Sequence, residues 1–279
     1  MHELRQSYPV AAMLRLVSLA PSTFYAWDAK RETPDKHARA KELIKQIYDE
    51  HKGRYGYRRI ACALKEYGIE LHANTVRRLM GLLSLKSVQR VKRYKSYKGS
   101  VGVVAPNHLE RDFSATEPNQ KWVTDVTEFK VGEQKVYLSG IKDLCTREIV
   151  AHELSLRPTM EFVNSTLKKA LATLGPDQAP LMHSDQGWHY QMPEFRKLLG
   201  DHHVVQSMSR KGNCLDNASM ESFFAVLKTE CYHKRKFADV DELMSVINEY
   251  IGYYNTERIS TVLGGLTPFQ YRIKFAQAA

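Results

Sequence analysis

Three acidic residues stand where an α/β protein could use carboxylates for chemistry. Asp125 lies in WVTDVTEF, Asp185 in HSDQGWHY and Glu221 in LDNASMESFFAVLKTE. Carboxylate oxygens are the ligands that Mg²⁺ prefers, and two such ions about 4 Å apart can stabilise both oxygens exchanged in a phosphoryl transfer. Each acid alone has an ordinary interpretation: Asp125 could pair with a lysine, Asp185 could cap a turn and Glu221 could face solvent. The set is more specific, because thirty-five residues separate the second acid from the third.

The segment around Glu221 predicts a helix with one apolar face. At 100° per residue, that face is formed by Met220, Phe223, Phe224, Leu227 and Cys231. Glu221 lies about 120° from the centre of this face, on a strip of small residues that leaves its carboxylate open to approach. Asp216 would point toward the apolar face if it were helical, so we expect it to cap the helix rather than act as the third carboxylate.

The sequence predicts that these acids are carried by a mixed sheet with flanking helices. Residues 121–131, 135–143 and 147–154 predict an antiparallel meander of three strands. A helix at 159–174, a short strand ending near Asp185, a helix at 193–200, a strand at 203–207 and the helix of Glu221 follow. Strands that alternate with helices after a meander indicate an α/β layer. Asp185 would then lie at the carboxyl end of the fourth strand, where open α/β sheets bind ligands.

The N-terminal part predicts helices. Apolar periodicity indicates helical segments within residues 9–27, 36–51, 57–68 and 71–83. The last two form a helix, a turn and a second helix, which would present Asn74, Thr75, Arg77 and Arg78 to a DNA major groove. The alternative is a small helical bundle with a solvated arginine face.

A basic segment follows these helices. Residues 84–100 contain six basic side chains, no acidic one, and the interleaved Tyr94 and Tyr97. The formal net charge is +10, and the whole excess lies in residues 1–120. Such asymmetry favours a polyanionic partner, although solubility alone is the simpler alternative. The expected DNA contacts in this segment are Arg90, Lys92, Arg93 and Lys95.

Composition disfavours membrane, secreted, disulfide-rich and zinc-binding proteins. No apolar run approaches the roughly 18 residues that a membrane span requires, and the N-terminus lacks a signal-peptide pattern, so we expect a cytoplasmic protein without membrane contact. The four cysteines are scattered without a CxxC pair, which disfavours a disulfide framework or a zinc site.

Taken with the spacing of the acids, the sequence resembles the retroviral-integrase-type transposases. More narrowly, it is similar to the second-frame (orfB) products of the insertion sequence three family. The supporting segments are RYGYRRI, SMSRKGNCLDNASMESFF and YYNTERISTVLGGLTPFQY. The resemblance implies an RNase H-like core, two Mg²⁺ ions for which Mn²⁺ can substitute, and DNA strand cleavage and strand transfer without a covalent protein intermediate.

The resemblance also implies roles for individual residues. Asp125, Asp185 and Glu221 match the catalytic triad and the metal ligands. Lys228 matches a catalytic basic residue, and the alternative for it is a plain surface lysine. Arg210 and Lys211 lie in the matching active-site loop and are expected to contact DNA. His183 either lines the site or packs at the strand end, and Arg258 is a candidate phosphate contact.

The implied partners are insertion-sequence terminal repeats and target DNA, bound by a homo-oligomer associated with the nucleoid. A frameshift fusion with the upstream reading frame, or a separate partner encoded by it, is also implied. The expected domains are a helical DNA-binding region at 1–83, a basic linker at 84–115, an RNase H-like core at 116–235 and a helical extension at 236–279.

Overall fold

The structure is a computed structural model that describes residues 3–32, 34–88, 104–210, 214–233 and 235–278. The predicted DNA contacts Arg90, Lys92, Arg93, Lys95 and Lys211 therefore lie outside the described residues. None of the described helices is both long enough and apolar enough to cross a membrane.

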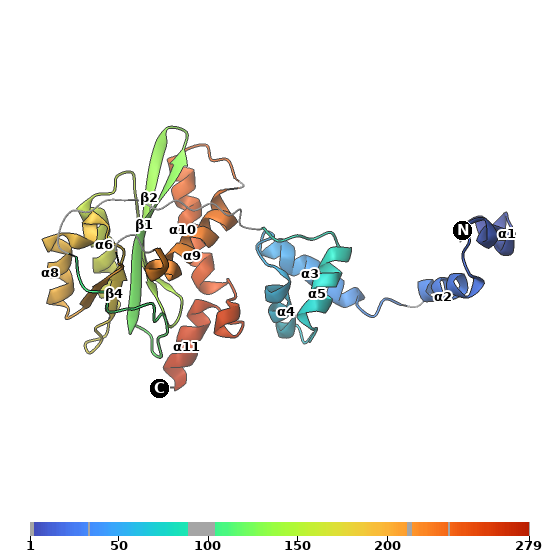
Figure 1. Cartoon of the computed structure of the whole chain (residues 1–279), viewed down its shortest axis with the longest axis horizontal. Coiled ribbons are helices and arrows are strands. Elements are labelled where there is room, and N and C mark those ends of the chain that lie inside the picture. The colour runs from blue at the N-terminus through green and yellow to red at the C-terminus, as the bar shows by residue number, and fades with distance from the viewer. Residues whose placement is uncertain (1–2, 33, 89–103, 211–213, 234, 279) are drawn as a thin grey trace.

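The N-terminal part consists of helices, as expected. A short 3₁₀ turn, η1 (Glu3–Gln6), precedes α1 (Val10–Leu16) and α2 (Pro21–Glu32), which lie apart from the remaining elements (Figure 1). Three helices then pack together: α3 (Ala38–Glu50), α4 (Tyr57–Glu66) and α5 (Ala73–Leu82). Their shared core includes the fully buried Ile44, Ile60, Leu64 and Val76. The turn after α4 runs through Gly68 at φ +72°, a left-handed conformation that favours glycine.

The second part is built on a mixed five-stranded sheet. Its strands are β1 (Lys121–Val131), β2 (Gln134–Asp143), β3 (Ile149–Ser155), β4 (Leu181–Ser184) and β5 (Val205–Met208). The order across the sheet is β3-β2-β1-β4-β5, with β1 in the centre. β1, β2 and β3 form the antiparallel meander that the sequence predicts, and β4 and β5 run parallel to β1.

Helices cover both faces of this sheet (Figure 1). On one face lie α6 (Met160–Leu171) and α8 (Pro193–Asp201), preceded by the short α7 (Trp188–Gln191). On the other lie α9 (Ala218–Leu227) and α10 (Val240–Thr256), and the chain continues through the 3₁₀ turn η4 (Thr261–Leu263) into α11 (Pro268–Ala278). Consecutive β1 residues point to opposite faces, so Trp122 packs with α6 and Val123 packs with α9. The sheet is thus buried on both sides.

The helix of Glu221 packs as its periodicity predicts. All five residues of the predicted apolar face are buried, namely Met220, Phe223, Phe224, Leu227 and Cys231. The helix is entered through a 3₁₀ turn, η2 (Cys214–Asn217), and continues into a single π-helical turn, η3 (Lys228–Tyr232). Single π-turns of this kind are frequent at functional sites.

The segment before β1 lies against the sheet. Residues 105–109, which fall within the expected linker, run beside β5, where the N–H of Met208 donates to the carbonyl oxygen of Pro106. The hydroxyl oxygen of Ser207 accepts from the N–H of Leu109 at 3.1 Å, and the Leu109 side chain is buried. This part of the expected linker therefore adds to the core.

Candidate active site

Asp125 lies in the middle of the central strand. β2 pairs with β1 on one side, and Asp125 stands opposite Gly140. Its side chain is half-buried, and its Oδ1 accepts from the N–H of Val126 at 2.7 Å. Burial and the negative charges of Asp185 and Glu221 raise the pKa of Asp125 well above its ordinary value. Asp185 and Glu221 therefore lie within electrostatic reach of Asp125.

Asp185 follows β4 directly. Because β4 runs parallel to β1 with His183 beside Val123, the strand register carries Asp185 to the level of Asp125. The Oδ1 of Asp185 accepts from the N–H of Gly187 at 2.8 Å, which forms the turn into α7. A Cβ atom on residue 187 would lie only 2.9 Å from that oxygen, so a side chain there would displace the Asp185 carboxylate. Asp185 is accessible to solvent, yet the protein around its carboxyl group still raises its pKa.

Glu221 lies in the first turn of α9, which packs on β1. Asn217 immediately precedes this helix, and its Nδ2 donates to the carbonyl oxygen of Thr124 at 3.2 Å. One residue before Glu221, Met220 lies so close to the sheet that a Cβ atom on Gly140 would be 2.7 Å from its Cε. These two contacts bring the start of α9 next to the strand that carries Asp125. The sequence reasoning missed both, although Asn217 lies within the quoted motif.

Lys228 begins the π-turn after α9. Its ammonium group lies 5.0 Å from the centre of the Phe129 ring, over the strand that carries Asp125. Burial lowers the pKa of Lys228, while the charges of Glu128 and Asp125 act in the opposite direction. The lysine therefore lies within electrostatic reach of Asp125.

The donor set suits a hard divalent cation. Among the residues that the structure describes, no three carboxylate, imidazole or thiolate groups already form a cluster that could hold a metal ion. The carboxyl groups of Asp125 and Asp185 nevertheless repel each other, and each has a raised pKa. A bound cation would relieve this repulsion, and oxygen ligands are those that Mg²⁺ prefers. The residues present therefore fit a divalent ion.

Asp216 is not the helix cap that the sequence suggests. It is fully buried in η2, and its carboxylate accepts from Arg111 Nε at 2.8 Å and from Arg210 Nε at 3.0 Å and Nη2 at 2.9 Å. The N-cap position of α9 is Asn217, whose side chain makes no capping hydrogen bond. The prediction was wrong because a 3₁₀ turn turns Asp216 away from the helix start, toward the two arginines. Nothing in the local pattern marks Arg111 as a partner.

Arg210 was expected to contact DNA and Arg258 was a candidate phosphate contact, and each has an acidic partner within the chain. Arg210 holds Asp216, while its own side chain stays 57% exposed. Arg258 is 8% exposed and binds Glu230 through Nε at 3.0 Å and Nη2 at 2.6 Å. The interpretation of Arg258 as a phosphate contact was wrong, because its guanidinium is used in a buried ion pair.

His183 packs inside the protein. Its ring is buried, with Nδ1 2.8 Å from the hydroxyl oxygen of Ser207 and Nε2 3.1 Å from that of Ser209. Burial lowers its pKa to about 4. Of the two interpretations of His183, the structure supports the packed one. Asp143, at the end of β2, accepts hydrogen bonds from the N–H groups of Asn119 and Thr146.

The predicted recognition residues lie on α5. Asn74, Arg77 and Arg78 are exposed, and Thr75 is half-buried. The guanidinium of Arg77 lies 5.8 Å from the centre of the Tyr57 ring, and that of Arg58 lies 5.1 Å from it. Arg58 at the start of α4 and Arg77 on α5 therefore form a basic face around the Tyr57 ring.

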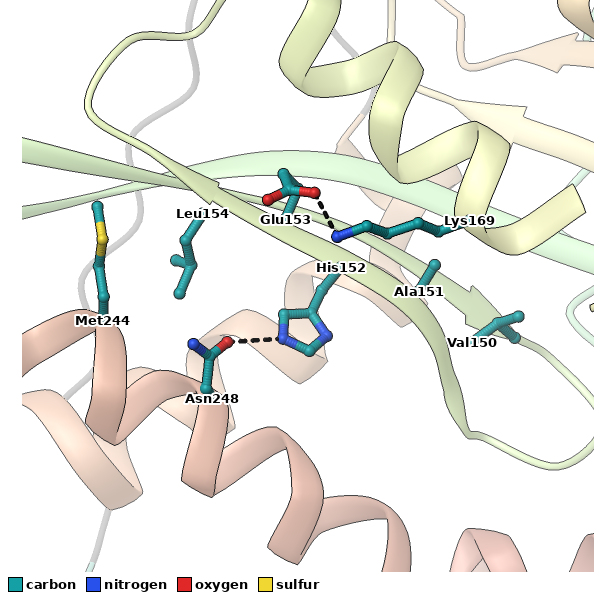
Figure 2. Close-up of a pocket in the computed structure, with 8 residues that line it drawn as sticks. All are labelled: Val150, Ala151, His152, Glu153, Leu154, Lys169, Met244 and Asn248. Atoms are coloured by element: carbon teal, nitrogen blue, oxygen red, sulfur yellow. Dashed lines mark hydrogen bonds and ion pairs between the residues drawn. The ribbon is translucent and has the colours of Figure 1, made fainter. Parts of the chain in front are cut away.

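A groove of about 520 Å³ lies elsewhere, along the edge strand β3 beside α10 (Figure 2). Within it, His152 Nε2 is 2.9 Å from Asn248 Oδ1, and Glu153 pairs with Lys169. None of the three predicted acids lines this groove.

Comparison with known proteins identifies both parts of the chain. The model of the integrase core domain matches residues 115–214, a second integrase core model matches residues 221–275, and an HTH-like domain matches residues 36–93. The chain is 50% identical over 272 residues to the putative transposase InsK of insertion sequence element IS150 from Escherichia coli K12, covering 98% of this chain and 96% of that protein. This chain belongs to the insertion-sequence transposases.

Two further comparisons extend this result. The transposase is 30% identical to the transposase InsF of insertion sequence IS3A from Escherichia coli K12, covering 96% of this chain and 95% of that one. Its fold is similar to that of a chain in the cryo-EM structure of a simian T-cell lymphotropic virus intasome bound to a PP2A regulatory subunit, with 17% identity and a TM-score of 0.50. That likeness covers 82% of the transposase and 74% of the viral chain. The expected RNase H-like fold with a preceding helix-turn-helix region is confirmed.

Proposed function

We propose that Asp125, Asp185 and Glu221 form the active site at which this transposase cuts and joins DNA at the ends of its insertion sequence. The observation that carries the proposal is geometric. β4 runs beside β1 with Asp185 at the level of Asp125, and α9, which carries Glu221, packs on β1 with the preceding Asn217 bound to Thr124. Three carboxylates in one site are costly without a cation, so their presence in a transposase core favours a catalytic role.

In this proposal the three carboxylates hold divalent metal ions, two Mg²⁺ ions or Mn²⁺ in their place. Ions held there would act as Lewis acids on the attacking oxygen of water or a 3′-hydroxyl and on the oxygen that leaves the phosphorus. Lys228 neutralises charge on the scissile phosphate from the same side of α9. Asn217, through its hydrogen bond to Thr124, keeps Glu221 level with the other two acids.

DNA binding is proposed for the helical part. The exposed start of α5, with Asn74, Thr75, Arg77 and Arg78, suits insertion into a major groove. The basic segment with Arg90, Lys92, Arg93 and Lys95, together with Arg210 and Lys211, would contact the phosphate backbone. The intasome to which the fold is similar supports assembly of several copies on DNA, and an upstream-frame module would be a further partner.

Single carboxamide substitutions test the active site. We expect Asp125→Asn, Asp185→Asn and Glu221→Gln each to reduce cleavage and strand transfer of labelled terminal-repeat DNA by at least about 10²-fold, the loss typical when one group that stabilises transition-state charge is removed. Asp201→Asn is the matched control, because Asp201 is an exposed acid paired with Lys197 on α8.

Metal binding is checked separately by thermal denaturation with and without Mg²⁺. Wild type and Asp201→Asn should gain stability with the ion, because binding to the folded state alone stabilises it. The three active-site variants should gain less. Joining of DNA at the wild-type rate by all three variants would show that the site lies elsewhere.

A further inference from the structure

The three-helix module α3–α5 is fixed to the C-terminal part of the chain. Tyr55, between α3 and α4, is fully buried, and its hydroxyl donates to the carbonyl oxygen of Glu257 at 2.8 Å. The same hydroxyl accepts from the N–H of Ile259 at 2.9 Å. Arg59 Nε donates to the carbonyl oxygen of Ile259 at 2.9 Å. Two side chains of the module thus bind the backbone just after α10, which we call the dock (residues 257–259).

Aromatic and charged contacts surround the dock. The His51 ring stacks on Tyr55 with ring centres 3.7 Å apart, and its Nδ1 lies 3.1 Å from the hydroxyl oxygen of Tyr253 on α10. The Arg54 guanidinium lies 4.5 Å from the centre of the Tyr253 ring. Lys52 pairs with Glu249 at the exposed rim.

The apolar interior is shared as well. Ile47 and Ile60 from the module belong to the same continuous buried cluster as Ile247 and Ile251 from α10. An interface between domains that is apolar and hydrogen-bonded holds their relative orientation, whereas a small polar one permits motion. In Figure 1, α3, α4 and α5 accordingly lie on the side of the sheet that α9 and α10 cover.

A buried ion pair connects the dock to the helix of Glu221. Arg258, the middle residue of the dock, binds both carboxylate oxygens of Glu230, and the Tyr250 hydroxyl donates to the same carboxylate at 2.9 Å. Glu230 lies in η3, the π-turn that continues α9 and begins at Lys228. A continuous set of bonds therefore runs from Tyr55 and Arg59 through Arg258 and Glu230 to the active-site helix.

We propose that Tyr55, Arg59, Arg258 and Glu230 are positioning residues that hold the DNA-binding face of α5 in a fixed relation to Glu221. Cleavage is then specific for element ends because an end held by the module is presented to the carboxylates at one set distance and angle. The inference rests on the proposed function for its catalytic consequence. Its structural consequence, ordering of α9 and η3 by the dock, does not depend on that function.

The test uses variants that weaken the dock without removing a charge. Tyr55→Phe deletes one hydroxyl that makes two hydrogen bonds, and Tyr55→Phe with Arg59→Lys weakens the dock further while the net charge is unchanged. Tyr48→Phe is the matched control, because the Tyr48 hydroxyl binds the carbonyl oxygen of Lys86 within the module and does not reach the dock. Substitution of Arg258 or Glu230 is avoided, since an unpaired buried charge could unfold the protein.

Two measurements are made on each full-length variant. The first is the cleavage rate on terminal-repeat DNA relative to nicking of unrelated DNA with Mn²⁺, together with the affinity for each DNA. The second is amide hydrogen exchange at Ile259 and across residues 218–232. We expect the cleavage ratio to fall about tenfold in the double variant and exchange in both regions to rise about as much, since each lost hydrogen bond changes a local equilibrium several-fold. The affinity of each variant for both DNAs should match that of wild type. Tyr48→Phe should match wild type in both measurements.

The outcomes separate the two proposals. Faster exchange at Ile259 with an unchanged cleavage ratio, or unchanged exchange at 218–232, would overturn the positioning role. Equal losses of terminal-repeat cleavage and of nicking of unrelated DNA would indicate general destabilisation. That result would also overturn the positioning role. Absence of cleavage by wild type on any DNA would contradict the proposed function, while the exchange of residues 218–232 would still decide whether the dock orders the active-site helix.

Discussion

At the scale of single residues, charge and burial define the proposed site and its surroundings. Asp125 lies on a strand with helices packed against both faces. Its pKa is raised by burial and by the negative charges of Asp185 and Glu221. Lys142, on the neighbouring strand β2, is the opposite case: it is 5% exposed, and its ammonium donates to the carbonyl oxygen of Ser219 at 3.3 Å. Burial lowers the pKa of Lys142 to about 7, and the positive charges of Arg147 and Arg258 add to that effect.

Lys142 makes the stability of the wild-type protein depend on pH in a defined way, and its substitution should remove that dependence. Between about pH 7 and 10.5 the folded protein holds fewer protons on Lys142 than the unfolded chain does, so its contribution to stability rises with pH in that window. Lys142→Met removes the buried charge, and we expect it to stabilise the protein by about 2 kcal/mol or more at pH 6.5. Above pH 7 the advantage should shrink by up to about 1.4 kcal/mol per pH unit.

Urea unfolding of both proteins at pH 6.5 and 9 measures this difference. Lys197→Met serves as the control, because Lys197 is 76% exposed and should show no such pH dependence. A stability difference between Lys142→Met and wild type that stays constant from pH 6.5 to 9 would mean that Lys142 does not titrate as its burial implies.

At the scale of elements, the distance between α9 and the sheet decides where Glu221 lies. Gly140 stands opposite Asp125 on β2 and leaves room for Met220, which is fully buried one residue before Glu221. A Cβ atom on residue 140 would lie 2.7 Å from Met220 Cε and 4.0 Å from Phe224 Cε1. A glycine at this position therefore permits the close approach of helix and strand.

Gly140→Ala should destabilise the fold by about 1–3 kcal/mol, because it overpacks this contact. It should also reduce DNA cleavage if α9 and Glu221 shift outward together with the Met220 methyl group. The second substitution Met220→Leu removes the Cε atom, so the double variant should recover part of both losses, with a coupling energy of about 0.5–3 kcal/mol. Denaturant unfolding and the cleavage assay measure the two effects.

Gly200→Ala is the control for loss of glycine, because no atom lies within 4 Å of its Cβ position in α8. It should be neutral or stabilise by about 0.4–1 kcal/mol. If the Gly140 and Met220 substitutions were simply additive, the close approach at this strand would not be what places α9.

At the scale of the whole molecule, charge is divided between two parts with different tasks. The N-terminal 120 residues carry all the excess positive charge, while the rest of the chain is balanced. The balanced part contains the proposed carboxylate site, and the basic part contains α5 and the segment with Arg90, Lys92, Arg93 and Lys95. Such a division would concentrate the attraction for DNA in the N-terminal part of the sequence, before the proposed carboxylate site.

Neutralising Arg90, Lys92, Arg93 and Lys95 with glutamine should weaken DNA affinity and flatten its salt dependence. Each lost phosphate contact reduces the slope of log K against log salt by about 0.9. The measurement is equilibrium DNA binding from about 50 to 200 mM salt. A matched variant neutralises four exposed cations on α6 and α8, namely Lys168, Lys169, Arg196 and Lys197. An equal change of slope in both variants would mean that the basic segment has no special contact with DNA.

The local sequence pattern determined the main secondary-structure elements and the family of this protein. The strand β1 and the helical arc of α9 were both predicted from local sequence pattern. The strand is present, and the five residues of the arc are buried. The spacing of Asp125, Asp185 and Glu221, with the quoted motifs, was enough to indicate the transposase family. Strands and helices of this kind depend on neighbouring residues, which is why they can be recognised without a structure.

Tertiary structure alone decided the partners of polar side chains. Asp216 was expected to cap a helix and instead holds Arg111, and Arg258 was expected at a phosphate and instead holds Glu230. The contact of Tyr55 with Ile259 joins residues 204 positions apart. No periodicity within one segment encodes such a pair, because the bond forms only after packing has brought the two segments together and removed water from between them.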